Sequence, residues 1–150
     1  YTTNDATFEI TGVQLEVGDS ATDFEHLSYA DNLLKCQRYF YMLADHDANG
    51  TAACFGIGQT FDTASGGFQA VFPCTMRAIP TIHSVNTGSP GFLYYKYNTY
   101  YHMSGGWYIH AGSNQGGQVY AGISSSPGEN QPGRFQTNAS GSQLGFIAEL

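Results

Sequence analysis

Gly12 to Phe40, with the sequence GVQLEVGDSATDFEHLSYADNLLKCQRYF, contains the signals that decide the fold of this chain. Before and within its first part, apolar residues alternate with polar ones, with one slip at Gly12. This period of two predicts a half-buried strand with a bulge at the glycine. The apolar members of the strand are Phe8, Ile10, Val13, Leu15 and Val17.

The second signal in this stretch is the start of a helix. Ser28 is followed by Asp31 at the spacing of a capping box, which predicts a helix of about ten residues. A helix this short is not stable alone, so we expect it to dock on a sheet. The inner stripe of this helix is predicted to consist of Tyr29, Leu33, Leu34 and Cys36.

Downstream of the helix, the chain has the pattern of many short strands separated by turn residues. Turns are predicted at 45–50, 98–99 and 104–106, and a loop rich in Gly, Pro and Asn at 124–133. This pattern predicts an all-β fold, a β-sandwich of jelly-roll type with one short N-terminal helix. The predicted strands cover 39–43, 51–61, 67–72, 76–79, 81–85, 92–97, 100–103, 107–111, 118–124 and 143–149.

The composition narrows the possible functions. Only 11% of the 150 residues are charged and the net charge is −7, which argues against nucleic-acid binding. Nine of the 12 carboxylates lie between Asp5 and Asp47, and from Pro80 onward only Glu129 and Glu149 remain. The second half is therefore a nearly uncharged surface rich in aromatic and amide side chains, which suits neutral glycans or another protein chain.

The cysteines and the hydropathy pattern indicate the cellular compartment in which the chain folds. Cys36, Cys54 and Cys74 are an odd number without C-x-x-C spacing, and we interpret them as free, buried thiols. Free thiols fit folding in a reducing cytoplasm. No signal peptide or membrane-spanning pattern is seen, so the chain is not expected to be membrane-embedded.

Several motifs occur in this order in a known family. They are Gln14-Leu15-Glu16-Val17-Gly18, Ala21-Thr22-Asp23-Phe24-Glu25, Cys36-Gln37-Arg38-Tyr39-Phe40, Phe72-Pro73-x-x-Met76-Arg77-x-x-Pro80-Thr81 and the ending Ala148-Glu149-Leu150. On these residues the chain resembles the C-terminal tip domain of bacteriophage tail-fibre proteins. Asp23 stands where proline is common in that family, and the region from Gly88 to Ser140 matches nothing in it.

The resemblance implies a homotrimeric fibre tip on the virion, folded in the host cytoplasm, that binds a host-cell surface receptor. It implies a connecting strand and loop from the upstream fibre over 1–27, and the tip domain over 28–150. Arg38 and Arg77 are candidate partners for carboxylates that would meet at a trimer axis. The receptor is expected to be a bacterial surface glycan or an outer-membrane protein.

The aromatic meander is the best candidate for ligand binding. Its first strand carries large residues on both faces, while only one face of a sandwich strand points into the core, so the other face is expected to expose tyrosines. The alternative is that these rings fill the core or the trimer interface. The predicted ligand-binding residues are Tyr94, Tyr95, Tyr97, Tyr100, Trp107, Tyr108, Asn114 and Gln115.

Metal and catalytic sites are expected to be absent. Asp45, Asp47 and Asn49 match the start of a calcium loop, but Gly56 stands where the bidentate glutamate belongs, so a hairpin turn is favoured and no cofactor is predicted. His102 and His110 are expected to face each other across the 104–106 turn as a cross-strand pair.

The chain is not expected to be an enzyme, because most carboxylates lie in the segment interpreted as scaffold. Two alternatives to receptor binding remain from the sequence. One is a structural cap that trimerises the fibre without binding a receptor. The other is a tail domain that degrades polysaccharide, which would require two opposed carboxylates in a cleft.

Overall fold

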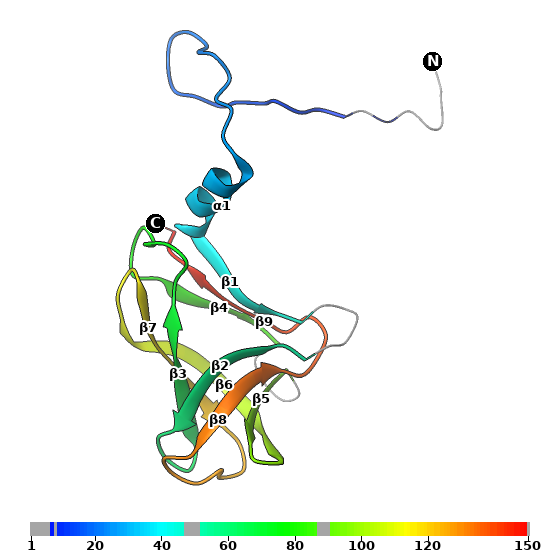
Figure 1. Cartoon of the computed structure of the whole chain (residues 1–150), viewed down its shortest axis with the longest axis vertical. Coiled ribbons are helices and arrows are strands. Elements are labelled where there is room, and N and C mark those ends of the chain that lie inside the picture. Colours follow the sequence, from blue (N-terminus) through cyan, green and yellow to red (C-terminus); the bar gives the residue numbers. More distant parts are fainter. Residues whose placement is uncertain (1–6, 8, 47–51, 87–90, 150) are drawn as a thin grey trace.

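Two antiparallel sheets and one helix make up the part of the chain that the computed structural model describes, residues 7, 9–46, 52–86 and 91–149 (Figure 1). The predicted all-β class with one short N-terminal helix is confirmed. The elements follow in the order α1 (Tyr29–Gln37), β1 (Phe40–Asp45), β2 (Cys54–Thr60), β3 (Ser65–Val71), β4 (Thr81–Val85), β5 (Phe92–Lys96), β6 (Thr99–Gly112), β7 (Gly116–Ile123), β8 (Pro132–Thr137) and β9 (Gln143–Ile147).

One of the two sheets closes on itself. Its strand order is β2-β3-β7-β6-β5-β8, and the ring is completed because β8 pairs with both β5 and β2. The second sheet is three-stranded, in the order β1-β9-β4, and lies at the end of the barrel beside α1 (Figure 1). The predicted jelly-roll sandwich is not confirmed, since a closed six-stranded barrel takes the place of one of its open sheets.

The longest strand corrects the predicted turn at 104–106. β6 runs without interruption from Thr99 to Gly112, pairing first with β5 and then with β7. Gly105 and Gly106 have φ angles of 91° and 68°, and the register of the β6–β7 pair shifts at this point. The two glycines therefore form a bulge that bends one strand around the barrel, instead of a turn between two strands.

Two other strand predictions are wrong. β8 lies in a region for which no strand was predicted, because its alternation comprises only Phe135 and Thr137 after a proline and a glycine. Conversely, residues 76–79 do not form a strand, and 77–79 are bends. The amide of Met76 donates to the carbonyl of Asn114, and the amide of Arg77 to the carbonyl of Arg38, so this segment is held by connections to loops.

The core is built mainly from aromatic rings that point into the barrel. Phe68 packs on Phe135 with ring centroids 5.2 Å apart, and Phe92 packs on Trp107 at 5.3 Å. The core continues into the three-stranded sheet, where Phe72 meets Phe146 at 4.8 Å. Inward residues of consecutive strands thus form one continuous apolar interior.

The N-terminal arm, residues 9–27, does not form the predicted strand. It extends away from the body of the fold and has no strand partner among the described residues (Figure 1). The apolar side chains of the alternating pattern that the structure describes, Ile10, Val13, Leu15 and Val17, are exposed, Leu15 being 99% exposed. A half-buried strand needs a neighbour for its hydrogen bonds and its apolar face, and this part of the chain supplies neither.

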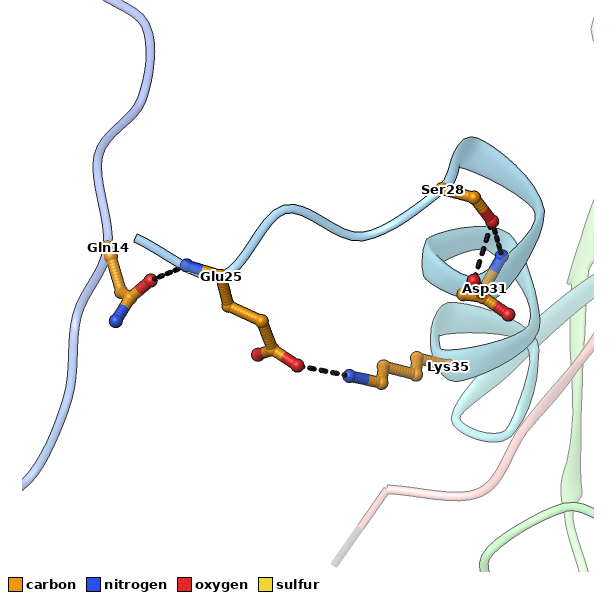
Figure 2. Close-up of polar contacts among 5 residues, drawn as sticks. All are labelled: Gln14, Glu25, Ser28, Asp31 and Lys35. Atoms are coloured by element: carbon orange, nitrogen blue, oxygen red, sulfur yellow. Dashed lines mark hydrogen bonds and ion pairs between the residues drawn. The ribbon is translucent and has the colours of Figure 1, made fainter. Parts of the chain in front are cut away.

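The polar members of the arm close it into a loop. Glu16 accepts hydrogen bonds from the amide and the hydroxyl of Thr22. Figure 2 shows the second link, in which the side-chain carbonyl of Gln14 accepts a hydrogen bond from the amide of Glu25. The hydroxyl and amide of Thr22, with the Gln14 side chain, hold the pKa of Glu16 below its ordinary value. Two of the resemblance motifs are therefore tied to each other across this loop.

Helix α1 begins as predicted but does not dock as predicted. Ser28 caps it by accepting from the amide of Asp31 at 3.2 Å, and its own hydroxyl donates to the Asp31 carboxylate (Figure 2). None of its residues is buried, so the expected inner stripe of Tyr29, Leu33, Leu34 and Cys36 is exposed. The helix is attached at its C-terminal end, where the carbonyl of Leu34 accepts from the thiol of Cys74.

The three thiols are free, as predicted, but they are not buried. Cys36 and Cys54 are exposed and Cys74 is half-buried. The expectation of core cysteines is wrong because the elements that carry Cys36 and Cys54 present them to the outside of the chain.

The position of Trp107 in the core gives a stability prediction. Replacing Trp107 by Ala should lower the free energy of unfolding by about 3–5 kcal/mol, because it leaves a cavity between Phe55, Phe68 and Phe92. The neighbouring Tyr108→Ala is the control: its ring is 51% exposed, so a loss of about 1 kcal/mol or less is expected. Urea unfolding followed by circular dichroism measures both, and equal losses would contradict the assignment.

Candidate functional site

The eight predicted ligand-binding residues fall into separate groups in the structure. Tyr94 and Trp107 are core residues, with 0% and 9% of their surface exposed. Their expected place on an exposed face is therefore wrong, and they are withdrawn from the candidate surface. The reason is that β5 and β6 carry large rings on both faces, and Tyr94 and Trp107 lie on the face that points into the closed barrel.

Tyr94 is held by its hydroxyl as well as by its ring. The ring packs on Phe135 with centroids 5.2 Å apart, and the hydroxyl donates to the carbonyl of Gln131. Gly133 makes room for it, because a Cβ at this position would lie 2.5 Å from the Tyr94 hydroxyl. Burial, assisted by the nearby Tyr101 and Tyr97, raises the pKa of Tyr94 to about 12.

Three of the predicted tyrosines gather where β5 turns into β6. Tyr95 is opposite Tyr100 in the strand pair, and Tyr97 lies in the turn with φ of 53°. The guanidinium of Arg134 lies 4.3 Å from the centre of the Tyr95 ring, and this cation–π contact covers part of it. Tyr97 and Tyr100 are left as exposed rings at this end of the barrel.

Tyr108 belongs to a different aromatic group on the outer wall of the barrel. It is opposite Tyr120 of β7, with ring centroids 5.6 Å apart. Tyr120 in turn stacks on Phe61 at 4.2 Å and on His110 at 4.7 Å. His110 therefore contacts this group and does not form the expected pair with His102, whose ring instead meets Tyr100.

Asn114 and Gln115 lie in the tight turn between β6 and β7. Their backbone carbonyls accept hydrogen bonds from Met76 and Phe72, at 2.7 and 3.0 Å. The turn thus fixes the segment that follows β3. The side chain of Gln115 is exposed, while that of Asn114 is half-buried.

The outer wall of β2, β3 and β7 contains polar and aromatic residues besides the eight predicted to bind ligand. Three glutamines, Gln59, Gln69 and Gln118, point outward from these strands, together with Tyr120. In β7 the signal was present, since Gln118 and Tyr120 alternate with the buried Val119. Phe61 gave no such signal, because it follows the end of β2 and reaches Tyr120 only through the strand pairing.

The candidate metal ligands are not assembled in the described structure. Asp45 is exposed at the end of β1 and accepts a hydrogen bond from the side-chain amide of Gln143, while Asp47 and Asn49 lie outside the described residues. Within residues 7, 9–46, 52–86 and 91–149, no group of three or more His, Cys, Asp or Glu is arranged to hold a metal ion. In the same residues, no helix is long and apolar enough to cross a bilayer.

Comparisons with known proteins gave no match to a family model, to a curated protein or to a solved structure. The interpretation of the chain therefore depends on its own residues and geometry.

The burial of the Tyr94 hydroxyl predicts how stability depends on pH. Because its pKa is about 12 in the folded chain, the folded state keeps this proton between about pH 10 and 12 while the unfolded state has lost it. Stability should therefore fall as the pH rises through this window. Tyr94→Phe should flatten that fall, measured by urea unfolding at a series of pH values.

The matched control for this measurement is Tyr100→Phe, which removes a hydroxyl from an exposed ring and should keep the wild-type profile. An unchanged profile in Tyr94→Phe would show that another group governs alkaline unfolding.

Proposed function

We propose that this chain is the tip domain of a bacteriophage tail fibre, that it assembles as a homotrimer, and that it attaches to a receptor on the bacterial surface. The resemblance of the N-terminal motifs suggests the identity. The observation that carries the proposal is the uncovered apolar surface of the N-terminal arm and helix α1.

Eight large apolar side chains are exposed between Ile10 and Leu34, next to a barrel that buries its own core. Exposed apolar patches of more than a few hundred Å² mark interaction sites on soluble proteins. These eight are Ile10, Val13, Leu15, Val17, Phe24, Tyr29, Leu33 and Leu34. Three copies with their arms and helices side by side would cover one another's apolar faces, which is the role expected of the upstream end of a fibre tip.

The charges in this region are compatible with such an assembly. Glu16 is bound within its own loop, and Glu25 lies 3.6 Å from the ammonium of Lys35 (Figure 2). Arg38 and Arg77 make no ion pair within the described residues, although Arg77 lies over the ring of Tyr39. Both guanidinium groups are thus available to carboxylates of a neighbouring copy.

The distal part of the fold supports attachment and not scaffolding alone. The outer wall of the barrel presents tyrosines and amides, which contact neutral sugars through ring stacking and hydrogen bonds. Tyrosine and amide side chains of this kind can bind a sugar without catalysing its cleavage. Receptor attachment, with a surface glycan as the favoured class, therefore fits this wall better than polysaccharide cleavage.

The proposal predicts the mass of the chain in solution. Light scattering should give three times 16.2 kDa, and Leu15→Asp combined with Leu33→Asp should reduce it to a single chain, because a carboxylate placed in an apolar interface loses its hydration. The matched control is Val71→Asp, an exposed apolar position outside the arm, which should remain trimeric.

Near-ultraviolet circular dichroism should show that the aromatic core of the double variant is still folded. A wild-type chain that is monomeric at all micromolar concentrations would contradict the assembly.

Attachment is tested by incubating the labelled chain with a panel of bacterial strains. We expect strain-restricted adhesion that is competed by soluble surface polysaccharide from the adhering strain. Release of reducing ends from that polysaccharide would instead support a degrading domain, and trimers that adhere to no strain would support a purely structural cap.

A further inference from the structure

The outer wall of the barrel contains a groove between β2, β3 and β7. It has a volume of about 340 Å³, within the range of about 300–1,000 Å³ that is usual for small-ligand sites. None of the eight residues predicted to bind ligand lines the groove. Its polar side chains are Gln59, Gln69 and Gln118, and its aromatic ones include Phe61 and Tyr120.

The floor of the groove is set by Gly67. This residue lies opposite Gln59 on one side and opposite Tyr120 on the other, so it interrupts a row of outward side chains. A Cβ at Gly67 would lie 2.3 Å from the carbonyl oxygen of Val119, 2.8 Å from the Tyr120 ring and 3.0 Å from the Phe61 ring. The missing side chain therefore allows both rings to approach the strand and leaves a hollow beside them.

The aromatic wall is held together by contacts within the chain. Phe61 and Tyr120 stack with centroids 4.2 Å apart, and His110 stacks against Tyr120 from β6. The amide of Phe61 donates to the carbonyl of Ser65 at 3.0 Å, which fixes the backbone at the end of β2. A wall that is ordered in advance loses little side-chain entropy when a ligand binds.

Amide side chains surround this wall. Gln69 of β3 and Gln118 of β7 are directly opposite each other, and Gln59 stands on the far side of Gly67. Gln118 accepts a long hydrogen bond from the Tyr120 hydroxyl, at 3.5 Å, while the side-chain amide of Gln59 has no partner among the described residues. The side-chain amide of Gln69 donates to the carbonyl of Ala70 at 3.4 Å. A glutamine amide has one acceptor oxygen and two donor hydrogens, so each of the three keeps hydrogen-bonding capacity for a sugar hydroxyl, which both donates and accepts.

The charge of the groove limits the class of ligand. No Asp, Glu, Lys, Arg or His is among the residues that line it. A charged ligand would lose hydration there without gaining a counter-charge, whereas a neutral pyranose can place its C–H face on the rings and its hydroxyls on the amides. An apolar peptide segment would leave the amides unpaired.

We propose that this groove binds a neutral oligosaccharide segment of the host-surface glycan. The inference deepens the proposed function and depends on it, because it names the class of receptor and the face that contacts it. The rings of Phe61 and Tyr120 support the sugar, and Gln59, Gln69 and Gln118 hold its hydroxyls.

The test uses the trimeric wild-type chain and purified polysaccharides, measured by biolayer interferometry. The probes are a panel of neutral O-antigen polysaccharides, with polysialic acid as the charged comparison. Gln69→Leu combined with Gln118→Leu should weaken binding at least tenfold, because the variant loses the hydrogen bonds of both members of this cross-strand pair. Gln136→Leu, at a half-buried glutamine of β8 that does not line the groove, is the matched control and should bind like the wild type.

Both glutamines of the double variant are exposed, so its thermal transition should be unchanged, and Gln59→Leu gives an independent variant on the opposite wall. Wild-type affinity in both groove variants, or preference for polysialic acid, would contradict sugar binding in the groove but not the proposal that the chain attaches to a receptor. Adhesion that depends on a surface protein alone would do the same. A chain that binds no strain and no polysaccharide would overturn both proposals.

Discussion

The pairing of β8 with both β2 and β5 is the constraint on which the rest of the structure depends, because it closes the sheet into a barrel. In a closed barrel each strand has one face in the interior, and alternate residues must point outward. Rings such as Phe68, Trp107 and Phe135 fill the interior. The same alternation places glutamines and tyrosines in rows on the outside, so the polar and aromatic outer wall follows from the packing of the core.

Local signals in the sequence were sufficient where the structure is local. The Ser28 cap was predicted from its spacing, and β4 spans the residues 81–85 that were predicted. Features set by distant partners were missed. β8 has too few alternating residues to be recognised alone, and Ser104-Gly105-Gly106 has the composition of a turn although it is a bulge in a strand that changes partners. Gly106 shows the ambiguity, since a positive φ is needed in both cases.

The candidate surface was predictable to a similar degree. Tyrosine-rich strands were recognised, but β5 is apolar on both faces, so alternation alone did not tell which rings, Tyr94 or Tyr95, point inward. The groove could not be predicted from the sequence. Phe61, Gly67 and Tyr120 come from three segments of the chain and meet only through the β2–β3–β7 pairing. Each of these residues can be read in the sequence, but only the strand topology brings them together.

The arm and the barrel both alternate apolar and polar residues, but their apolar faces end up in opposite environments. The barrel turns its apolar face inward, whereas the arm leaves Val13, Leu15 and Val17 uncovered and uses its polar face to close a loop. The loop closed by the polar face of the arm also affects where its charges lie. With Glu16 bound by Thr22 and Glu25 facing Lys35, two of the carboxylates in the most acidic part of the chain are directed into the loop or toward the helix. In the proposed trimer, neighbouring copies would therefore approach on the apolar side without meeting these two charges, because both are already bonded within their own copy.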